Sequence, residues 1–97
     1  MKIVKRHKKI LDIDLFSKAV TVSNENEILT VLNWHNQMNN RWASGDKPND
    51  ETMINLLNGY VNEYGCATIE LSPPITCGAH YEDSNISFND FLELAYQ

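Results

Sequence analysis

The chain has little of what a disulfide-rich, secreted or membrane-spanning protein contains. Its 97 residues include two cysteines, three prolines and four glycines. Two cysteines are too few for a disulfide framework, so a reducing compartment, the cytoplasm, is expected. No run of about 18 apolar residues occurs, which predicts no membrane span. Asp12 and Asp14 interrupt the apolar stretch that follows the basic start, so this segment does not have the pattern of a secretory signal.

Basic side chains are nearly missing from most of the chain. Residues 19–97 have only Arg41 and Lys47 against eleven acidic side chains, a formal charge of −9. Residues 1–18 have six basic side chains against two acidic ones, a formal charge of +4. Such an asymmetry concerns partners rather than fold. An acidic body repels nucleic acid and attracts proteins whose basic clefts bind it, so we expect a nucleic-acid-binding protein as the partner.

Length and composition predict one domain over residues 1–97. Apolar residues make up 42% of the chain and charged residues 22%, which is enough for one modest core. Within that domain, residues 1–22 are expected to form a basic strand or hairpin segment. Residues 23–97 are expected to form the acidic body.

Alternation of apolar and polar residues predicts strands at both ends of the chain. Residues 2–5 and 10–22 fit strands, with a turn near residues 16–18 that would make an early hairpin. Residues 66–71 alternate again until Pro73 and Pro74 end the pattern. Residues 75–81 fit a strand or a loop equally well.

Three helices are predicted from capping residues and apolar spacing. The first has Asn24 as its cap, with Glu27 completing a capping box, and is expected to continue to Gly45. The second follows Asn49 or Asp50 and ends at Gly65, and Gly59 inside it indicates close packing against a neighbour. The third has Ser87 as its cap, and Ile86 is expected to pack on Phe91. The apolar positions are Ile28, Val31, Leu32, His35, Met38 and Trp42 in the first helix, Met53, Leu57, Tyr60, Val61 and Tyr64 in the second, and Phe88, Phe91, Leu92 and Ala95 in the third.

The order of these elements predicts an α+β fold. A small, mostly antiparallel sheet would be packed on one face by two to three helices. His35, on the apolar stripe of the first helix, is expected to be a half-buried structural histidine.

One small cluster has residues that bind metals or act as nucleophiles. Cys66, Cys77 and His80 could hold three corners of a zinc site, but a structural site normally has four ligands. Cys77 and His80 could also pair as nucleophile and base, with Glu82 or Asp83 orienting the imidazole, but no oxyanion loop accompanies them. We therefore predict no catalytic residue, no metal and no cofactor, and a protein that is not an enzyme.

The basic run Lys5–Lys9, which includes His7, has two interpretations. It could contact phosphates and bind nucleic acid directly. Alternatively, its lysines protect the solvated edge of a strand from pairing with another chain. Because the body is acidic and the aromatic residues are needed for the core, the second interpretation is favoured.

The acidic side chains are the candidate partner-binding residues. Acids at the start of a helix also stabilise it, and this accounts for several of them. That explanation does not account for the scarcity of lysine, because surfaces of small domains normally intersperse both signs. The acids are joined by two residue types that are frequent in interaction hot spots. The predicted contact residues are Glu25, Glu27, Arg41, Trp42, Asp46, Asp50, Glu51 and Glu63.

This profile resembles the small inhibitors of bacterial defence encoded by phages and prophages, notably anti-CRISPR proteins of the acidic DNA-mimic kind. The shared features are a length of about a hundred residues, a motif-free domain, the acids from Glu25 to Glu93, and an asparagine-rich composition. The resemblance implies a non-enzymatic inhibitor that docks where a CRISPR effector complex binds target DNA. The basic segment 1–18 departs from a pure DNA mimic. An immunity protein or antitoxin that neutralises a basic nuclease toxin is the alternative, because it needs the same electrostatics.

Overall fold

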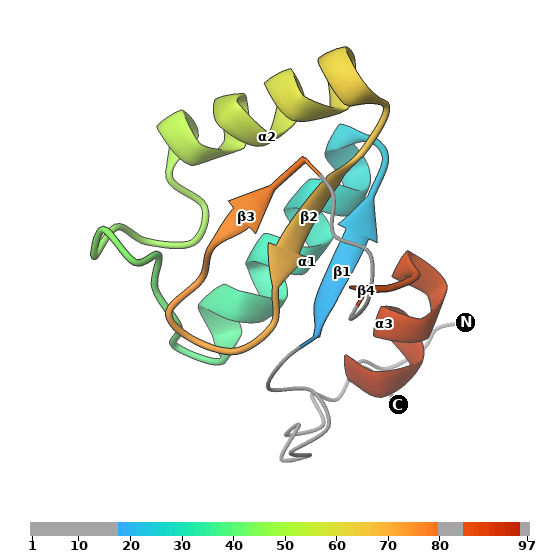
Figure 1. Cartoon of the computed structure of the whole chain (residues 1–97). Coiled ribbons are helices and arrows are strands. Elements are labelled where there is room, and N and C mark those ends of the chain that lie inside the picture. The colour runs from blue at the N-terminus through green and yellow to red at the C-terminus, as the bar shows by residue number, and fades with distance from the viewer. Residues whose placement is uncertain (1–17, 80–84, 96–97) are drawn as a thin grey trace.

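The computed structural model describes residues 18–79 and 85–95, which form three helices and a four-stranded mixed sheet. Helices α1 and α2 pack against each other, and α1 runs behind the sheet in the view of Figure 1. This is the small α+β fold that the sequence predicts. The elements are β1 (Ala19–Val22), α1 (Glu25–Gln37), α2 (Glu51–Tyr64), β2 (Ala67–Glu70), β3 (Cys77–Gly78), β4 (Asn85–Ile86) and α3 (Phe88–Ala95).

The sheet has the order β3-β2-β1-β4, so its two edges are the short strands β3 and β4. β1 pairs with β2 and β2 with β3 in antiparallel fashion, whereas β1 and β4 are parallel. Val20 at the centre lies opposite Ile69 of β2 and Ile86 of β4. The part of the predicted strand region 10–22 that follows its expected turn is therefore a strand, β1. The predicted hairpin partner within residues 2–15 lies outside the described residues.

All three helices begin at the predicted capping residues. Asn24 Oδ1 accepts the Glu27 backbone N–H at 2.9 Å, and Asp50 accepts that of Thr52 at 3.1 Å. Ser87 Oγ accepts the Asp90 N–H at 3.1 Å. These side chains satisfy backbone donors that the first turn of a helix leaves unpaired. The capping box differs in one detail, because the Glu27 carboxylate accepts the N–H of Ser23, the residue before the cap, at 2.8 Å.

The predicted end of the first helix is wrong. α1 ends at Gln37, eight residues before Gly45, and Asn39 adopts a left-handed backbone conformation with φ 67°. Asparagine tolerates this conformation better than most residues. Trp42 consequently lies outside the helix, where it makes a parallel β-bridge with Ile75. Gly45, at φ 94°, belongs to the turn that follows.

Two expectations for α2 are also corrected. Tyr64 is 58% exposed and does not face the core, which α2 enters with Leu57. Gly59 is exposed, and a Cβ atom built there would meet nothing within 4 Å, so it does not mark close packing.

The open surroundings of Gly59 give a stability prediction. Gly59→Ala should raise the free energy of unfolding by about 1 kcal/mol, because alanine loses less conformational entropy in a helix interior and meets no steric obstacle here. Urea denaturation followed by circular dichroism measures the change. Gly65→Ala is the matched control and should destabilise the protein, because Gly65 ends α2 at φ 88°. A neutral or destabilising Gly59→Ala would contradict this account of the helix.

One hydrophobic core joins the helices and the sheet. It includes Val20 and Val22 from β1, Ile69 from β2 and Leu32 from α1, all fully buried. α3 packs against β1 and enters the same core, where the Phe91 and Trp34 rings make a T-shaped contact with a centroid distance of 5.5 Å. These contacts fix the loops that connect the elements, and the candidate residues lie in and beside those loops.

Candidate partner-binding surface

The loop between α1 and α2 places three of the predicted acids at one end of α2. Its shape depends on Trp42, which is 3% exposed and whose indole N–H donates to the Pro48 carbonyl oxygen at 2.9 Å. The Trp42 backbone N–H donates to Asp46 O, and the Gly45 N–H donates to Trp42 O. The glycine occupies the left-handed region that this tight turn requires. The loop is thus held on a buried aromatic ring.

The acids of this loop are exposed or half-buried, and the hydrogen bonds of Asp46 and Asp50 are to residues close to them in the sequence. The Asp46 carboxylate accepts the Ser44 hydroxyl at 2.9 Å, and the Asp50 carboxylate is the cap of α2. Glu51 follows in the first turn of α2 and is exposed. We call these three side chains, Asp46, Asp50 and Glu51, the loop acids. A basic partner could approach them without disturbing the core.

The remaining predicted acids lie near the other end of α2. Glu63 is exposed in the last turn of α2, and Glu25 and Glu27 occupy the first turn of α1. In Figure 1 the start of α1 lies beside the end of α2. We call Glu25, Glu27 and Glu63 the end acids. Because α2 has 14 residues, about 20 Å of helix separates the two groups.

The two predicted non-acidic contact residues differ in position. Arg41 is exposed, and its guanidinium donates to the Gly45 carbonyl oxygen at 3.4 Å. Trp42 is buried and offers a partner almost no surface. The indole therefore supports the loop from inside, and we remove Trp42 from the proposed contact residues.

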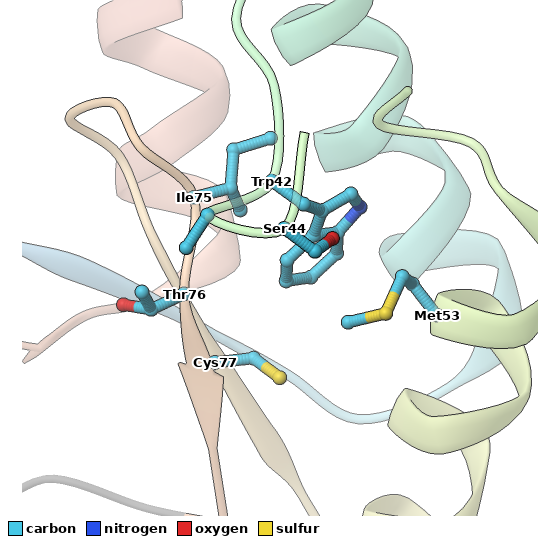
Figure 2. Close-up of a pocket in the computed structure, with 7 residues that line it drawn as sticks. Trp42, Ser44, Met53, Ile75, Thr76 and Cys77 are labelled. Atoms are coloured by element: carbon cyan, nitrogen blue, oxygen red, sulfur yellow. The ribbon is translucent and has the colours of Figure 1, made fainter. Parts of the chain in front are cut away.

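Sequence reasoning missed a surface depression beside this loop. It has a volume of about 270 Å³ and lies between residues 42–44, α2 and the edge segment 75–77. Figure 2 shows the side chains of Trp42, Met53 and Cys77 pointing toward one another across it. The spacing of apolar residues assigned Trp42 to the first helix, so it did not predict that Trp42 lies next to residues 75–77. The signal in the sequence was the pair Asn39-Asn40, which interrupts the helical pattern.

His35 is more deeply buried than predicted, at 0% exposure. Its Nε2 lies 2.9 Å from the carbonyl oxygen of Glu70, and its Nδ1 lies 3.0 Å from the Asn40 side-chain nitrogen. Because a carbonyl oxygen only accepts, Nε2 carries the proton and Nδ1 accepts from Asn40. Burial lowers the pKa of His35 from 6.5 to about 4, against the opposing effect of the Glu70 carbonyl. The imidazole therefore joins α1, β2 and the following turn in its neutral form.

The absence of metal and catalytic residues stays a prediction, and His80, Glu82 and Asp83 lie outside the described residues. Within residues 18–79 and 85–95, no group of three His, Cys, Asp or Glu side chains could hold a metal ion. The Cys66 thiol donates to the Ala79 carbonyl oxygen at 3.6 Å. Cys77 instead lines the depression, and burial raises the pKa of its thiol, which disfavours the reactive thiolate.

Neither a family model, nor a curated protein, nor a solved structure matches this chain. None of the helices within the described residues is long and apolar enough to cross a membrane.

Proposed function

We propose that this protein is a non-enzymatic inhibitor whose acidic surface occupies a basic nucleic-acid-binding site on another protein. A CRISPR effector complex in a bacterial cytoplasm is the first candidate partner. The observation that carries the proposal is the charge of the folded body. The described residues have nine carboxylates against three basic side chains, and the loop acids and end acids stand on the surface. No direct contact with nucleic acid and no membrane contact is part of the proposal.

The placement of the acids supports a contact along α2. Loop acids and end acids lie about 20 Å apart at the two ends of this helix. Phosphates on one DNA strand are spaced by about 3.4 Å, so a groove that binds several of them extends over a comparable distance. Electrostatic matching over such a distance speeds association and selects partners.

The proposal predicts a loss of inhibition when the acids are neutralised. The triple variant Asp46→Asn, Asp50→Asn, Glu51→Gln should bind its partner at least about tenfold more weakly at low salt and with a shallower salt dependence. Asparagine also caps helices, so the change at residue 50 keeps α2 intact. The measurement is displacement of target DNA from a purified CRISPR effector complex across a salt series.

A matched variant separates the two ends of the surface. Glu25→Gln, Glu27→Gln, Glu63→Gln removes the same number of charges from the end acids. If both ends contact the partner, each triple variant weakens binding and the sextuple variant abolishes it. Unchanged affinity in the sextuple variant would refute the electrostatic proposal. Capture of a nuclease toxin from a lysate, in place of an effector complex, would favour the immunity-protein alternative.

A further inference from the structure

The outer edge of the sheet beside the depression has an incomplete strand. Glu70 N–H donates to Thr76 O at 2.9 Å, which makes Ile69 and Cys77 a non-hydrogen-bonded pair of the β2–β3 ladder. In such a pair the backbone N–H and C=O point away from the neighbouring strand. The backbone groups of Cys77 therefore point outward, at the edge of the sheet.

Two residues before Cys77, the outward backbone groups at this edge are already hydrogen-bonded to another segment of the chain. Ile75 N–H donates to Arg41 O at 2.9 Å, and Ala43 N–H donates to Ile75 O at 3.1 Å. Residues 41–43 thus lie alongside the edge as a short parallel partner. The chain then turns away at Gly45, where its N–H bonds back to Trp42 O. The pairing therefore includes Ile75 but does not extend to Cys77, the next residue whose backbone groups point outward.

An apolar surface adjoins the place where the pairing stops. A residue paired with Cys77 would direct its side chain to the same face of the sheet as Cys77, and that face holds the depression lined by Trp42, Met53 and Ile75. Leu56 and Tyr60 follow Met53 at helical spacing, so they continue the same side of α2. Leu56 is 41% exposed, and Tyr60 is half-buried.

Negative charge next to the depression indicates which kind of peptide segment could bind there. Ser44 lines the depression, and its hydroxyl binds the Asp46 carboxylate. Asp50 caps α2 one turn before Met53, and Glu51 is its neighbour. Negative charge beside an apolar depression favours a segment that has both an apolar side chain and a nearby lysine or arginine.

From this geometry we propose that β3 binds an extended segment of a partner protein by strand addition. The segment pairs with the outward backbone groups of Cys77, places an apolar side chain in the depression beside Met53, and places a basic side chain near the loop acids. Backbone pairing supplies the affinity in this mode of recognition, and the pocket supplies the specificity. The proposal rests on the proposed function, because it assigns the partner protein a basic surface.

The test uses the full chain and a displayed library of random nine-residue peptides. Selection should enrich peptides that have alternating apolar residues and at least one lysine or arginine. The critical variant is Cys77→Pro, which removes the outward N–H; an outward position on an edge strand tolerates proline. Cys77→Ala is the control, because it also removes the thiol but keeps the N–H. Cys77→Pro should weaken binding of the selected peptide at least tenfold, and Cys77→Ala less than threefold.

A second measurement does not depend on the folding of the proline variant. An N-methyl group on the peptide residue that pairs with Cys77 should weaken binding to the unaltered protein at least tenfold. Equal binding of the methylated and unmethylated peptides at every position scanned, or the absence of enriched peptides, would overturn the proposal. Loss of DNA displacement in the loop-acid variant together with unaltered displacement in Cys77→Pro would also overturn it, while leaving the proposed function intact.

Discussion

Replacing Trp42 by alanine should lower the free energy of unfolding by about 3–5 kcal/mol. Trp42 is 3% exposed, joins the edge segment through its bridge to Ile75 and donates its indole N–H to Pro48 O. Alanine leaves a cavity and an unpaired carbonyl at Pro48, which is itself fully buried. Chemical denaturation measures the loss. The same variant should also lower the affinity for any partner that contacts the loop acids, because the Trp42 ring holds their loop in place.

Trp34 provides a control for the hydrogen bond that Trp42 makes to Pro48. Trp34 is buried to a similar extent, but within the described part of the chain its indole N–H has no hydrogen-bond partner. Trp42→Phe should therefore cost about 1–2 kcal/mol more than Trp34→Phe, since only Trp42→Phe leaves a buried acceptor unpaired. Equal costs for the two phenylalanine variants would show that the bond to Pro48 does not hold the loop.

Stability should fall by about 3 kcal/mol as the pH is lowered from 6.5 to 4, because of His35 alone. The pKa of His35 is lowered to about 4 by burial, so in this range the unfolded chain binds a proton that the folded protein does not. The stabilisation is complete above pH 6.5 and is lost as the pH falls to about 4. Burial raises the pKa of the Glu70 carboxyl, which acts in the opposite direction over the acidic part of this range.

Two variants identify His35 as the source of this pH dependence. His35→Gln does not titrate, so the loss between pH 6.5 and 4 should become smaller. Asn40→Asp places a carboxylate next to Nδ1, which lies 3.0 Å from the Asn40 amide nitrogen, and should raise the pKa of His35. The acid-induced loss should then still begin near pH 6.5, where the unfolded chain binds its proton, but should end at a higher pH and be smaller. An identical pH profile in both variants and in the unaltered protein would exclude the imidazole as its source. Urea denaturation at several pH values provides the comparison.

Local signals in the sequence predicted the starts of the helices well. Asn24, Asp50 and Ser87 accept backbone hydrogen bonds within their own first turns, and Gly65 ends α2 at a positive φ. Such contacts involve neighbours in the chain, so residue type and spacing are enough to find them. The α+β class followed from the order of the elements in the same way.

Features that depend on distant contacts could not be predicted. The hydrophobic spacing of Trp42 fits a helix, yet its ring belongs to a loop that is fixed by Ile75 and Pro48. The candidate acids illustrate the same point. The loop acids are neighbours in sequence, but the end acids form one group only because α1 and α2 pack together. The depression likewise needs three segments that no local pattern connects.

The central position of β1 has a consequence for the order of folding events. Its two neighbours in the sheet, β2 and β4, come from the second half of the chain, so neither pairing is local. A topology dominated by such distant pairings folds slowly for its size, on a scale of roughly milliseconds to seconds. On the ribosome, β1 emerges well before β4 is synthesised. The sheet therefore cannot be completed before β4 has been made, and a nascent chain halted before Ile86 lacks one of the strands that flank its centre.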